Sequence, residues 1–379
     1  MVDSEGITRM TNTEMLTYAL QVGLCVAVLY SMVGLFSIPQ PLALLPLLWG
    51  LGVIIIAWRF GDDQHIFYSS DQAQMITNIS IFERDGFSLH PEVLLGRRDM
   101  ITVPAWVLWK SGIHPLLALK FLQAVSLLLT IRAVVAYAPT ALREALNERR
   151  LLWLFLIGPS LWFNSLLGLR DQVLVAGVTW FYTSSNSQTK AMWLMVISLL
   201  RPHLGVAVLL STLVIRSISL PNHSPIKVAV KMVASFTFGV LLYGIGDSIT
   251  GGRFSGLPVL VSQDRLLRLL AAFSSLNFLV VDSSTVDQSF STLFLARIVF
   301  FDTWLIPLTF LGVVLIWSRV SSMLERRVLV AFSLFAGISS ETDFISSRQL
   351  TPFFPVMALI GLAGVLRVST RRSRMLSSA

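Results

Sequence analysis

The stretch Leu42-Ala-Leu-Leu-Pro-Leu-Leu-Trp-Gly-Leu-Gly-Val-Ile-Ile-Ile-Ala-Trp58 carries no ionisable side chain over 17 residues. A helix needs about 17–25 such residues to cross the roughly 30 Å hydrocarbon core of a bilayer. Other apolar runs approach or exceed this length, at Leu116–Tyr137, Leu151–Leu167, Val228–Ile245 and Leu293–Trp317. The alternating ten-residue segments of a membrane β-barrel are missing from the sequence. We therefore expect an all-α, polytopic membrane protein.

The composition agrees with this expectation. Of the 379 residues 54% are hydrophobic and 13% are charged, and the mean hydropathy is +0.73. A water-soluble core of this length cannot hide so much apolar surface, so the excess must face lipid. The net charge of +8 comes from scattered basic residues rather than from a soluble basic face, so we expect no nucleic-acid partner.

The first apolar run contains Cys25, the only cysteine of the chain. A single cysteine excludes an intramolecular disulfide and a cysteine metal cluster. The N-terminus lacks a basic region followed by a cleavage site, so we expect this run to be a retained helix rather than a signal peptide.

The positions of Lys and Arg predict the topology, because these residues accumulate in cytoplasmic loops. Three basic segments are placed inside: residues 143–150, 318–327 and the tail 367–379. An outer loop over residues 60–115, a second one over 247–291, a third over 339–348 and the N-terminus then fall outside. Residues 1–379 are expected to form a single membrane domain.

A single membrane crossing over Ala191–Arg216 conflicts with this topology. It would invert every later loop and place the basic tail outside. Arg201-Pro202 lies at its middle, and proline lacks an amide donor and disfavours a continuous helix. We predict a broken, re-entrant hairpin, and a total of about 9–11 transmembrane helices.

Acidic residues in the first outer loop are the first candidates for chemistry. Asp62 and Asp63 follow an apolar run directly, where they are either a solvated helix end or a pair that binds a divalent cation or abstracts a proton. The segment Ser70–Phe82 has the apolar spacing of an amphipathic helix lying on the membrane surface. Asp71 in its first turn is either a helix cap or a catalytic base.

Arginines near helix ends are the second group of candidates, since a planar guanidinium matches two phosphate oxygens at once. Arg170-Asp171 separates two apolar runs, and Arg201 and His203 flank the predicted break. Each is either a structural partner or a ligand contact. Arg348 precedes the last apolar run, where it either anchors the loop or binds phosphate. Two further outer arginines belong to the predicted substrate-binding set: Arg98, and Arg265, whose spacing with Arg268 also suits contact with anionic lipid. The five histidines lack zinc-ligand spacing, so the metal content stays open.

These groups of charged residues, in this order along the chain, resemble the motifs of the GT-C superfamily of membrane glycosyltransferases and of the related O-antigen-type polysaccharide polymerases. The motifs are Asp62-Asp63 through Asp71-Gln-Ala-Gln-Met to Asp85-Gly86, Gly168-Leu-Arg170-Asp171, Leu200-Arg201-Pro202-His203, and Ser347-Arg348 with Pro352 and Pro355. Family members place the acidic loop after the first helix, whereas here a predicted hairpin precedes it.

The resemblance implies transfer of a sugar or glycan from a polyprenyl-(di)phosphate carrier to a glycan or lipid acceptor. It implies a bacterial inner membrane and a site facing the periplasm, whereas the cytoplasmic C-terminus follows from the basic tail. The arginines would hold phosphate, and Asp71, Asp63 and Asp62 would be the candidate bases, in that order. Two alternatives stay open: a transporter or flippase of a lipid-linked anion, which would share an arginine-lined cavity and a broken helix, and a non-catalytic membrane assembly subunit.

Overall fold

The computed structural model describes residues 11–60, 69–90, 93, 97–138, 140–148, 152–168, 170–217, 224–249, 302–316, 323–340 and 350–377. Every regular element within these residues is a helix, which confirms the all-α class. Four helices among them are long and apolar enough to cross a membrane: Asn12–Leu35, Gln40–Trp58, Pro115–Tyr137 and Pro225–Ile245. The expected total of 9–11 crossings stays a prediction.

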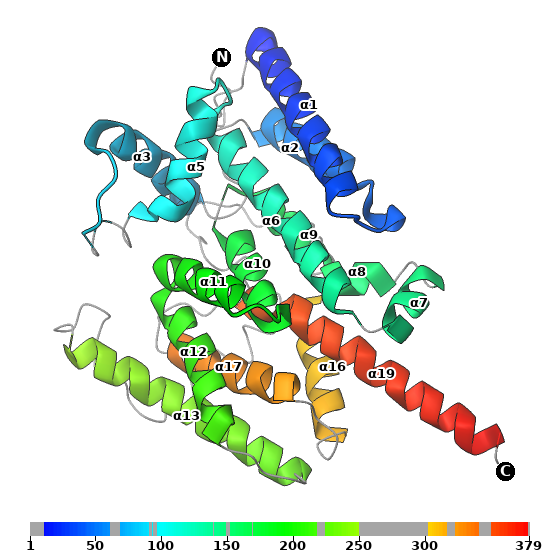
Figure 1. The fold of residues 1–379 in the computed structure, drawn as a ribbon. Coiled ribbons are helices and arrows are strands. Elements are labelled where there is room, and N and C mark those ends of the chain that lie inside the picture. Colours follow the sequence, from blue (N-terminus) through cyan, green and yellow to red (C-terminus); the bar gives the residue numbers. More distant parts are fainter. Residues whose placement is uncertain are drawn as a thin grey trace. The chain divides into compact units, whose positions relative to one another are not determined.

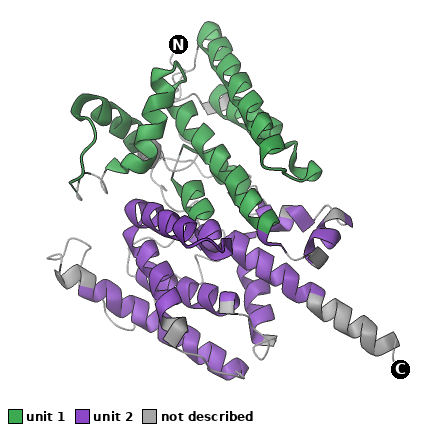
Figure 2. Cartoon of the chain, in the orientation of Figure 1, with its two compact units in different colours: residues 1–136, 160–177 green, residues 137–159, 178–379 purple. Residues whose placement is uncertain are grey.

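The chain forms two compact units (Figure 2). Unit 1 comprises residues 1–136 and 160–177, and unit 2 comprises residues 137–159 and 178–379. Each is described by itself. The expected single membrane domain over residues 1–379 stays a prediction.

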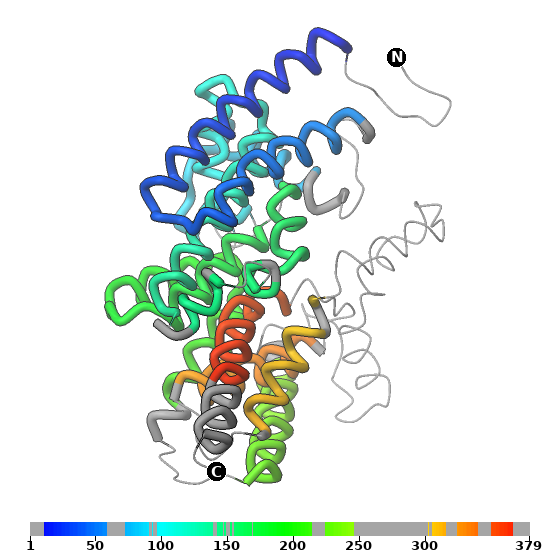
Figure 3. Tube along the Cα trace, turned by 90° about the vertical axis from the view of Figure 1, so that its right-hand side faces the viewer, coloured from blue at the N-terminus to red at the C-terminus, as the bar shows by residue number. Residues whose placement is uncertain are grey.

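Unit 1 begins with a helical hairpin of α1 (Asn12–Leu35), the short η1 (Gln40–Leu42) and α2 (Leu45–Phe60), in which α1 packs on α2 (Figures 1 and 3). A capping box starts α1, because the side chains of Thr11 and Glu14 bond each other's backbone amides. One stripe of α1 is buried and the opposite stripe, with Leu16, Leu20 and Leu24, is exposed. An exposed apolar stripe on a helix of this length suits contact with lipid.

Helix α6 (Pro115–Tyr137) is buried over most of its length in unit 1. Near its start, the Tyr18 ring of α1 contacts the His114 ring, and the Gln21 side chain bonds the backbone of Gly112 and His114. Further along, Leu29 of α1 lines the same small apolar hollow as Leu128 of α6. Residues later in α1 contact or lie near residues later in α6, so the two helices run parallel. The charge-based topology requires this relative direction.

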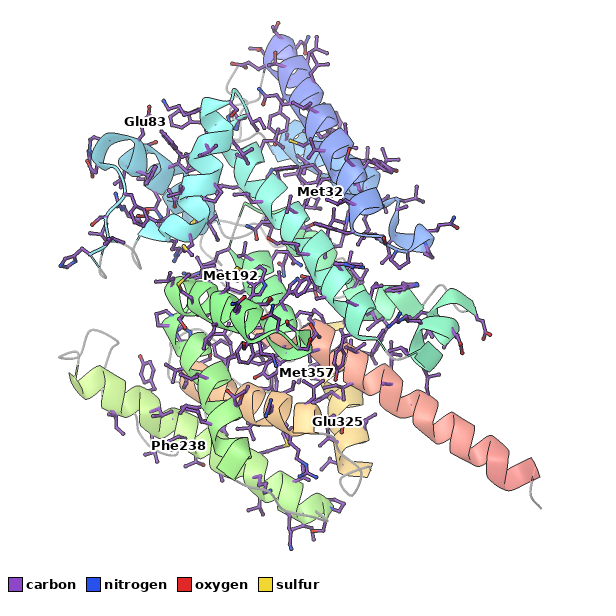
Figure 4. All side chains as sticks on the ribbon, in the orientation of Figure 1. Met32, Glu83, Met192, Phe238, Glu325 and Met357 are labelled. Carbon is purple, nitrogen blue, oxygen red and sulfur yellow. The ribbon has the colours of Figure 1, made fainter. Side chains whose placement is uncertain are left out.

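The first predicted outer loop contains two helices that pack on each other, α3 (Ser69–Asp85) and α5 (Asp99–Lys110). The amphipathic helix expected over 70–82 is present, and Met75, Ile79 and Phe82 are buried on its apolar face. Figure 4 labels Glu83 on α3, whose carboxylate forms an ion pair with Lys110 at the end of α5. The position of helix α3 at a membrane surface stays a prediction.

Unit 2 contains two closely packed helix pairs. Helix α13 (Pro225–Ile249) packs on α17 (Met323–Ser340), and α16 (Asp302–Ile316) packs on α19 (Phe354–Ser377), which follows the 3-10 turn η4 (Thr351–Phe353). Gly361 lies against Thr309 and Gly364 lies against Val313, so the second pair runs parallel. Glycines let helix backbones approach closely, as is common in membrane proteins.

Two apolar runs are interrupted. The run expected as one crossing over Leu151–Leu167 is divided at Gly158, which has φ +67°, into α8 (Leu152–Ile157) and α9 (Pro159–Ser165). Proline at the start of α9 and a left-handed glycine before it explain the division. The break expected at Arg201-Pro202 is also present, between α11 (Ser187–Leu200) and α12 (Pro202–Ser217), which pack on each other. Whether this hairpin is re-entrant stays a prediction.

The remaining helices connect these parts. Helix α7 (Thr140–Glu148) packs on α19 in unit 2. Helix α10 (Asp171–Thr183) starts in unit 1 and ends in unit 2.

Candidate functional site

The interior of unit 1 contains polar side chains that its apolar helices do not require. Lys120 and Gln123 lie one turn apart on α6, and both are buried. Asp171 and Gln172 start α10 and are also buried, at 1% and 0% exposure. Ionisable groups inside membrane helices cost about 2.5–3.5 kcal/mol each on insertion scales, so their presence in a buried position usually has a functional reason.

The segment between α9 and α10 runs alongside the first turns of α6. A Cβ on Gly168 would collide with Leu116 and would press on Leu119, so the absence of a side chain lets this segment lie directly on α6. Four residues later, the backbone N–H of Gln172 donates to Oε1 of Gln123 at 3.1 Å. These two anchors place Arg170 and Asp171 beside the Lys120–Gln123 turn of α6.

Three buried carboxamides on α6, α9 and α10 of unit 1 have polar atoms with no partner in the described part of the chain. They are Nε2 of Gln123, both side-chain heteroatoms of Gln172, and both of Asn164 on α9. Leaving a buried polar group unpaired costs about 1–3 kcal/mol. Their unpartnered atoms include both hydrogen-bond donors and acceptors. Such atoms suit ordered water, or a ligand that carries hydroxyl groups.

A second polar group lies in unit 1 between α3 and α5. Nη2 of Arg97 donates to Oδ2 of Asp99 at 3.1 Å, and both side chains are almost fully buried. Burial raises the pKa of Asp99, and the charge and hydrogen bond of Arg97 oppose that rise. Arg98, from the predicted substrate-binding set, has the left-handed backbone conformation with φ 55°, and its Nη1 lies 3.8 Å from Sδ of Met75.

The third group lies in unit 2, at the break between α11 and α12. Arg201 ends α11 in an extended conformation, with φ −153° and ψ 86°, and is buried at 5% exposure. The His203 ring is stacked on Phe335 of α17, with 5.5 Å between centroids and an interplanar angle of 2°. Phe335 in turn contacts Phe353 of η4. The aromatic stack fixes the orientation of the His203 ring, two residues after the buried Arg201.

The predicted site residues are therefore divided. Arg98, Arg170 and Asp171 belong to unit 1, whereas Arg201 and His203 belong to unit 2. Asp71 lies in the first turn of α3, but its side chain is outside the described residues. Asp62, Asp63, Arg265 and Arg348 also lie outside them.

No group of three metal-ligating side chains occurs in the described residues. The divalent cation considered at Asp62 and Asp63 stays a prediction, because the described ranges exclude both aspartates.

Sequence reasoning missed the interior partners of the predicted residues. A lysine inside the apolar run Leu116–Tyr137 is a signal that could have identified Lys120. The carboxamides Gln123, Asn164 and Gln172 give no comparable signal, because uncharged polar residues are common in membrane helices. Their grouping depends on the packing of α9 and α10 on α6.

Comparisons of the chain with protein-family models, with curated proteins and with solved structures found no match. The functional argument therefore depends on the residues and their geometry.

Proposed function

We propose that this chain is a membrane glycosyltransferase or polysaccharide polymerase. It transfers a sugar or glycan from a polyprenyl-(di)phosphate carrier to a glycan or lipid acceptor on the outer face of a bacterial inner membrane. In the reaction the bond between the anomeric carbon and the phosphate oxygen breaks. The acceptor oxygen bonds to that carbon, its proton passes to a carboxylate base, and the lipid phosphate leaves.

One observation carries the proposal: Lys120, Asp171, Gln123 and Gln172 are buried together where α10 starts beside α6 in unit 1. A phosphate at membrane depth needs cations, and Lys120 and Arg170 are the basic residues of this part of unit 1. Sugar hydroxyls need neutral donors and acceptors, which the unpartnered carboxamides supply. Charge stabilisation of the departing phosphate is the expected main contribution to rate.

The remaining roles follow from the sequence resemblance. Asp71 is the first candidate base, and Asp63 and Asp62 are the next, with a divalent cation as a further possibility at the adjacent pair. Arg201, His203, Arg348, Arg98 and Arg265 are proposed to contact the lipid-linked donor.

A transporter or flippase of a lipid-linked anion is the second candidate, and the break at Arg201 favours it. Transporters commonly bind substrates at discontinuous helices, where a helix N-terminus points at the anionic group. Helix α12 begins directly after the buried Arg201.

Arg170→Ala and Arg201→Ala test the proposal in a deletion strain complemented with each variant. We expect loss of the envelope glycan while the protein stays in the membrane, because each change removes a proposed phosphate contact. Gel analysis separates the reactions: a lost polymerase leaves single-repeat products, and a lost transferase leaves a glycan lacking one residue. Arg84→Ala is the matched control, since this arginine is 75% exposed and pairs with Asp85.

Full glycan synthesis by both variants would refute the phosphate role. Accumulation of complete lipid-linked glycan on the inner leaflet would instead identify the transporter. A purified chain that transfers sugar from a polyprenyl-diphosphate donor in detergent would exclude the transporter, because no second compartment exists there.

A further inference from the structure

The contact between α3 and α5 in unit 1 contains polar side chains that two packed helices do not require (Figure 1). Met75, Ile79 and Phe82 form the buried apolar face of α3, and Asn78 is buried on the same face at 5% exposure. An amide in this position needs a hydrogen-bond partner, because burial removes it from water.

The two helices run parallel, and this direction fixes the order of side chains along their contact. Nη1 of Arg98 lies 3.8 Å from Sδ of Met75. Further along both helices, the rings of Phe82 and Trp106 meet edge to face, with 5.3 Å between centroids. Asn78 lies between Met75 and Phe82 in α3, so its place along the contact is between Arg98 and Trp106.

Four polar atoms at this contact are buried without a hydrogen-bond partner among the described residues. Three are donors, Nδ2 of Asn78, Nε of Arg97 and Nε1 of Trp106, and one is an acceptor, Oδ1 of Asp99. Nearly all buried polar groups of native proteins have a partner, from the protein or from another molecule. A ligand that contacts both helices would supply the partners that the chain does not.

The charges around these atoms indicate that the ligand is neutral. The guanidinium of Arg97 is paired with Asp99, and Asp85, within electrostatic range of Arg97, is paired with Arg84. An anion at Arg97 would therefore meet the carboxylate of Asp99. A hydroxyl group suits both, because its oxygen accepts from the N–H donors and its proton bonds the carboxylate oxygen.

The spacing of the four atoms indicates a ligand with several hydroxyl groups. Asp99 and Trp106 are seven residues apart in α5, which is about 10 Å along a helix. A single hydroxyl group cannot serve atoms so far apart. An oligosaccharide carries hydroxyl groups over such a length.

We propose that α3 and α5 bind a neutral glycan through four residues, Asn78, Arg97, Asp99 and Trp106. The site rests on the proposed function only in the naming of this glycan as the acceptor of the transferred sugar. Asp71, the first candidate base, precedes Met75 by about one turn of α3.

The test measures glycan binding by the purified full chain in detergent, using calorimetry and no lipid-linked donor. The probe is the oligosaccharide that mild acid releases from the lipid-linked glycan of the host cell. We expect Asn78→Leu and Trp106→Phe each to weaken its binding by about two- to tenfold, the usual effect of one lost hydrogen bond. Gln74→Leu, at an exposed position of α3, and Trp109→Phe in α5 are the matched controls and should bind like the wild type.

Thermal unfolding without glycan separates a ligand contact from a structural role. Asn78→Leu should unfold at or above the wild-type temperature, because it removes a buried donor that has no partner among the described residues. A lower unfolding temperature would mean that the amide serves the fold, and would overturn its role in binding.

Three binding results would also overturn the proposal: no binding by the wild type, equal binding by Asn78→Leu and Trp106→Phe, or an equal loss in the two controls. Inorganic pyrophosphate that competes with the glycan would overturn the assignment to a neutral ligand and would indicate an anion site. A failed sugar-transfer assay would refute the proposed function alone, because the binding differences are measured without a donor.

Discussion

Asp99, a buried residue at the start of α5, makes the stability of the protein depend on pH. Its side chain has no exposure, its Oδ2 accepts from Arg97, and its Oδ1 has no partner within the described residues. Burial disfavours the charged carboxylate more than Arg97 favours it, so the pKa is raised. The native state therefore binds this proton more tightly than the unfolded chain does.

This difference predicts a pH-dependent stability. Asp99 contributes stability that is complete below the ordinary pKa of 3.8 and is lost as the pH rises through the raised native pKa. Asp99→Asn should remove this loss, so that its unfolding free energy varies less with pH above 3.8 than that of the wild type. Chemical denaturation in detergent at a series of acidic pH values measures this pH dependence of the unfolding free energy.

The matched control is Asp85→Asn at the end of α3. The hydrogen bond and charge of Arg84 lower the pKa of Asp85, so any stability that it contributes is lost as the pH falls. The control should therefore change the pH dependence in the opposite sense, and only slightly, because the pair is exposed. An unchanged profile for Asp99→Asn would mean that this carboxyl has the same pKa in both states.

Close helix crossings determine the packing of the elements in unit 2. Gly337 of α17 lies so close to the carbonyl oxygen of Phe236 that no Cβ fits. The obstacle is backbone, which cannot rotate away as a flexible side chain can. A single methyl group at this position must therefore move one helix away from the other.

Gly337→Ala should destabilise the protein by about 1–3 kcal/mol, the usual cost of overpacking an interior. Gly312→Ala in α16 is the control, because a Cβ there meets nothing within 4 Å. An alanine in an open helical position is neutral or stabilising, by up to about 1 kcal/mol. Denaturation in detergent micelles compares the two, and equal stability of both variants would show that the helices separate at no cost.

At the scale of the whole molecule, the helix directions within each unit bear on topology. In unit 1, α1 and α6 run parallel. Helix α2 lies between them in the sequence and forms a hairpin with α1. The start of α1 and the start of α6 therefore lie at the same end of unit 1, and the connection between α1 and α2 lies at the other end. If both helices cross a membrane, these ends lie on opposite sides.

Cysteine labelling in intact cells tests this arrangement, in a background where Cys25 is replaced by Ala. A membrane-impermeant thiol reagent should label Thr13→Cys and Ser111→Cys from the same side, because both positions are exposed near the parallel helix starts. Gln40→Cys should be labelled only after the cells are opened. Labelling of Thr13→Cys and Ser111→Cys from opposite sides would contradict the parallel arrangement.

Much of the fold could be predicted from the sequence because membrane helices are coded locally. A long apolar run satisfies its own backbone hydrogen bonds as a helix, so the runs at Leu42–Trp58 and Leu116–Tyr137 predicted their helices directly. Proline removes an amide donor at its own position, so the break at Arg201-Pro202 was also predictable. Gly158-Pro159 carries a similar local signal, and the apolar run Leu151–Leu167 is divided there into two short helices. Whether this segment crosses a membrane stays a prediction.

The candidate site was predictable only in part, because ionisable residues are conspicuous in an apolar sequence whereas their partners are not. Arg170 and Asp171 were identified from their position between two apolar runs. That Gln123 accepts from the backbone of Gln172, and that Asp99 is buried with Arg97, required the packing of distant segments. The sequence by itself determined which segments are apolar helices and where ionisable groups interrupt them. Only the tertiary structure decided which of those groups share an interior, since a pairing between helices depends on crossing points that no local pattern encodes.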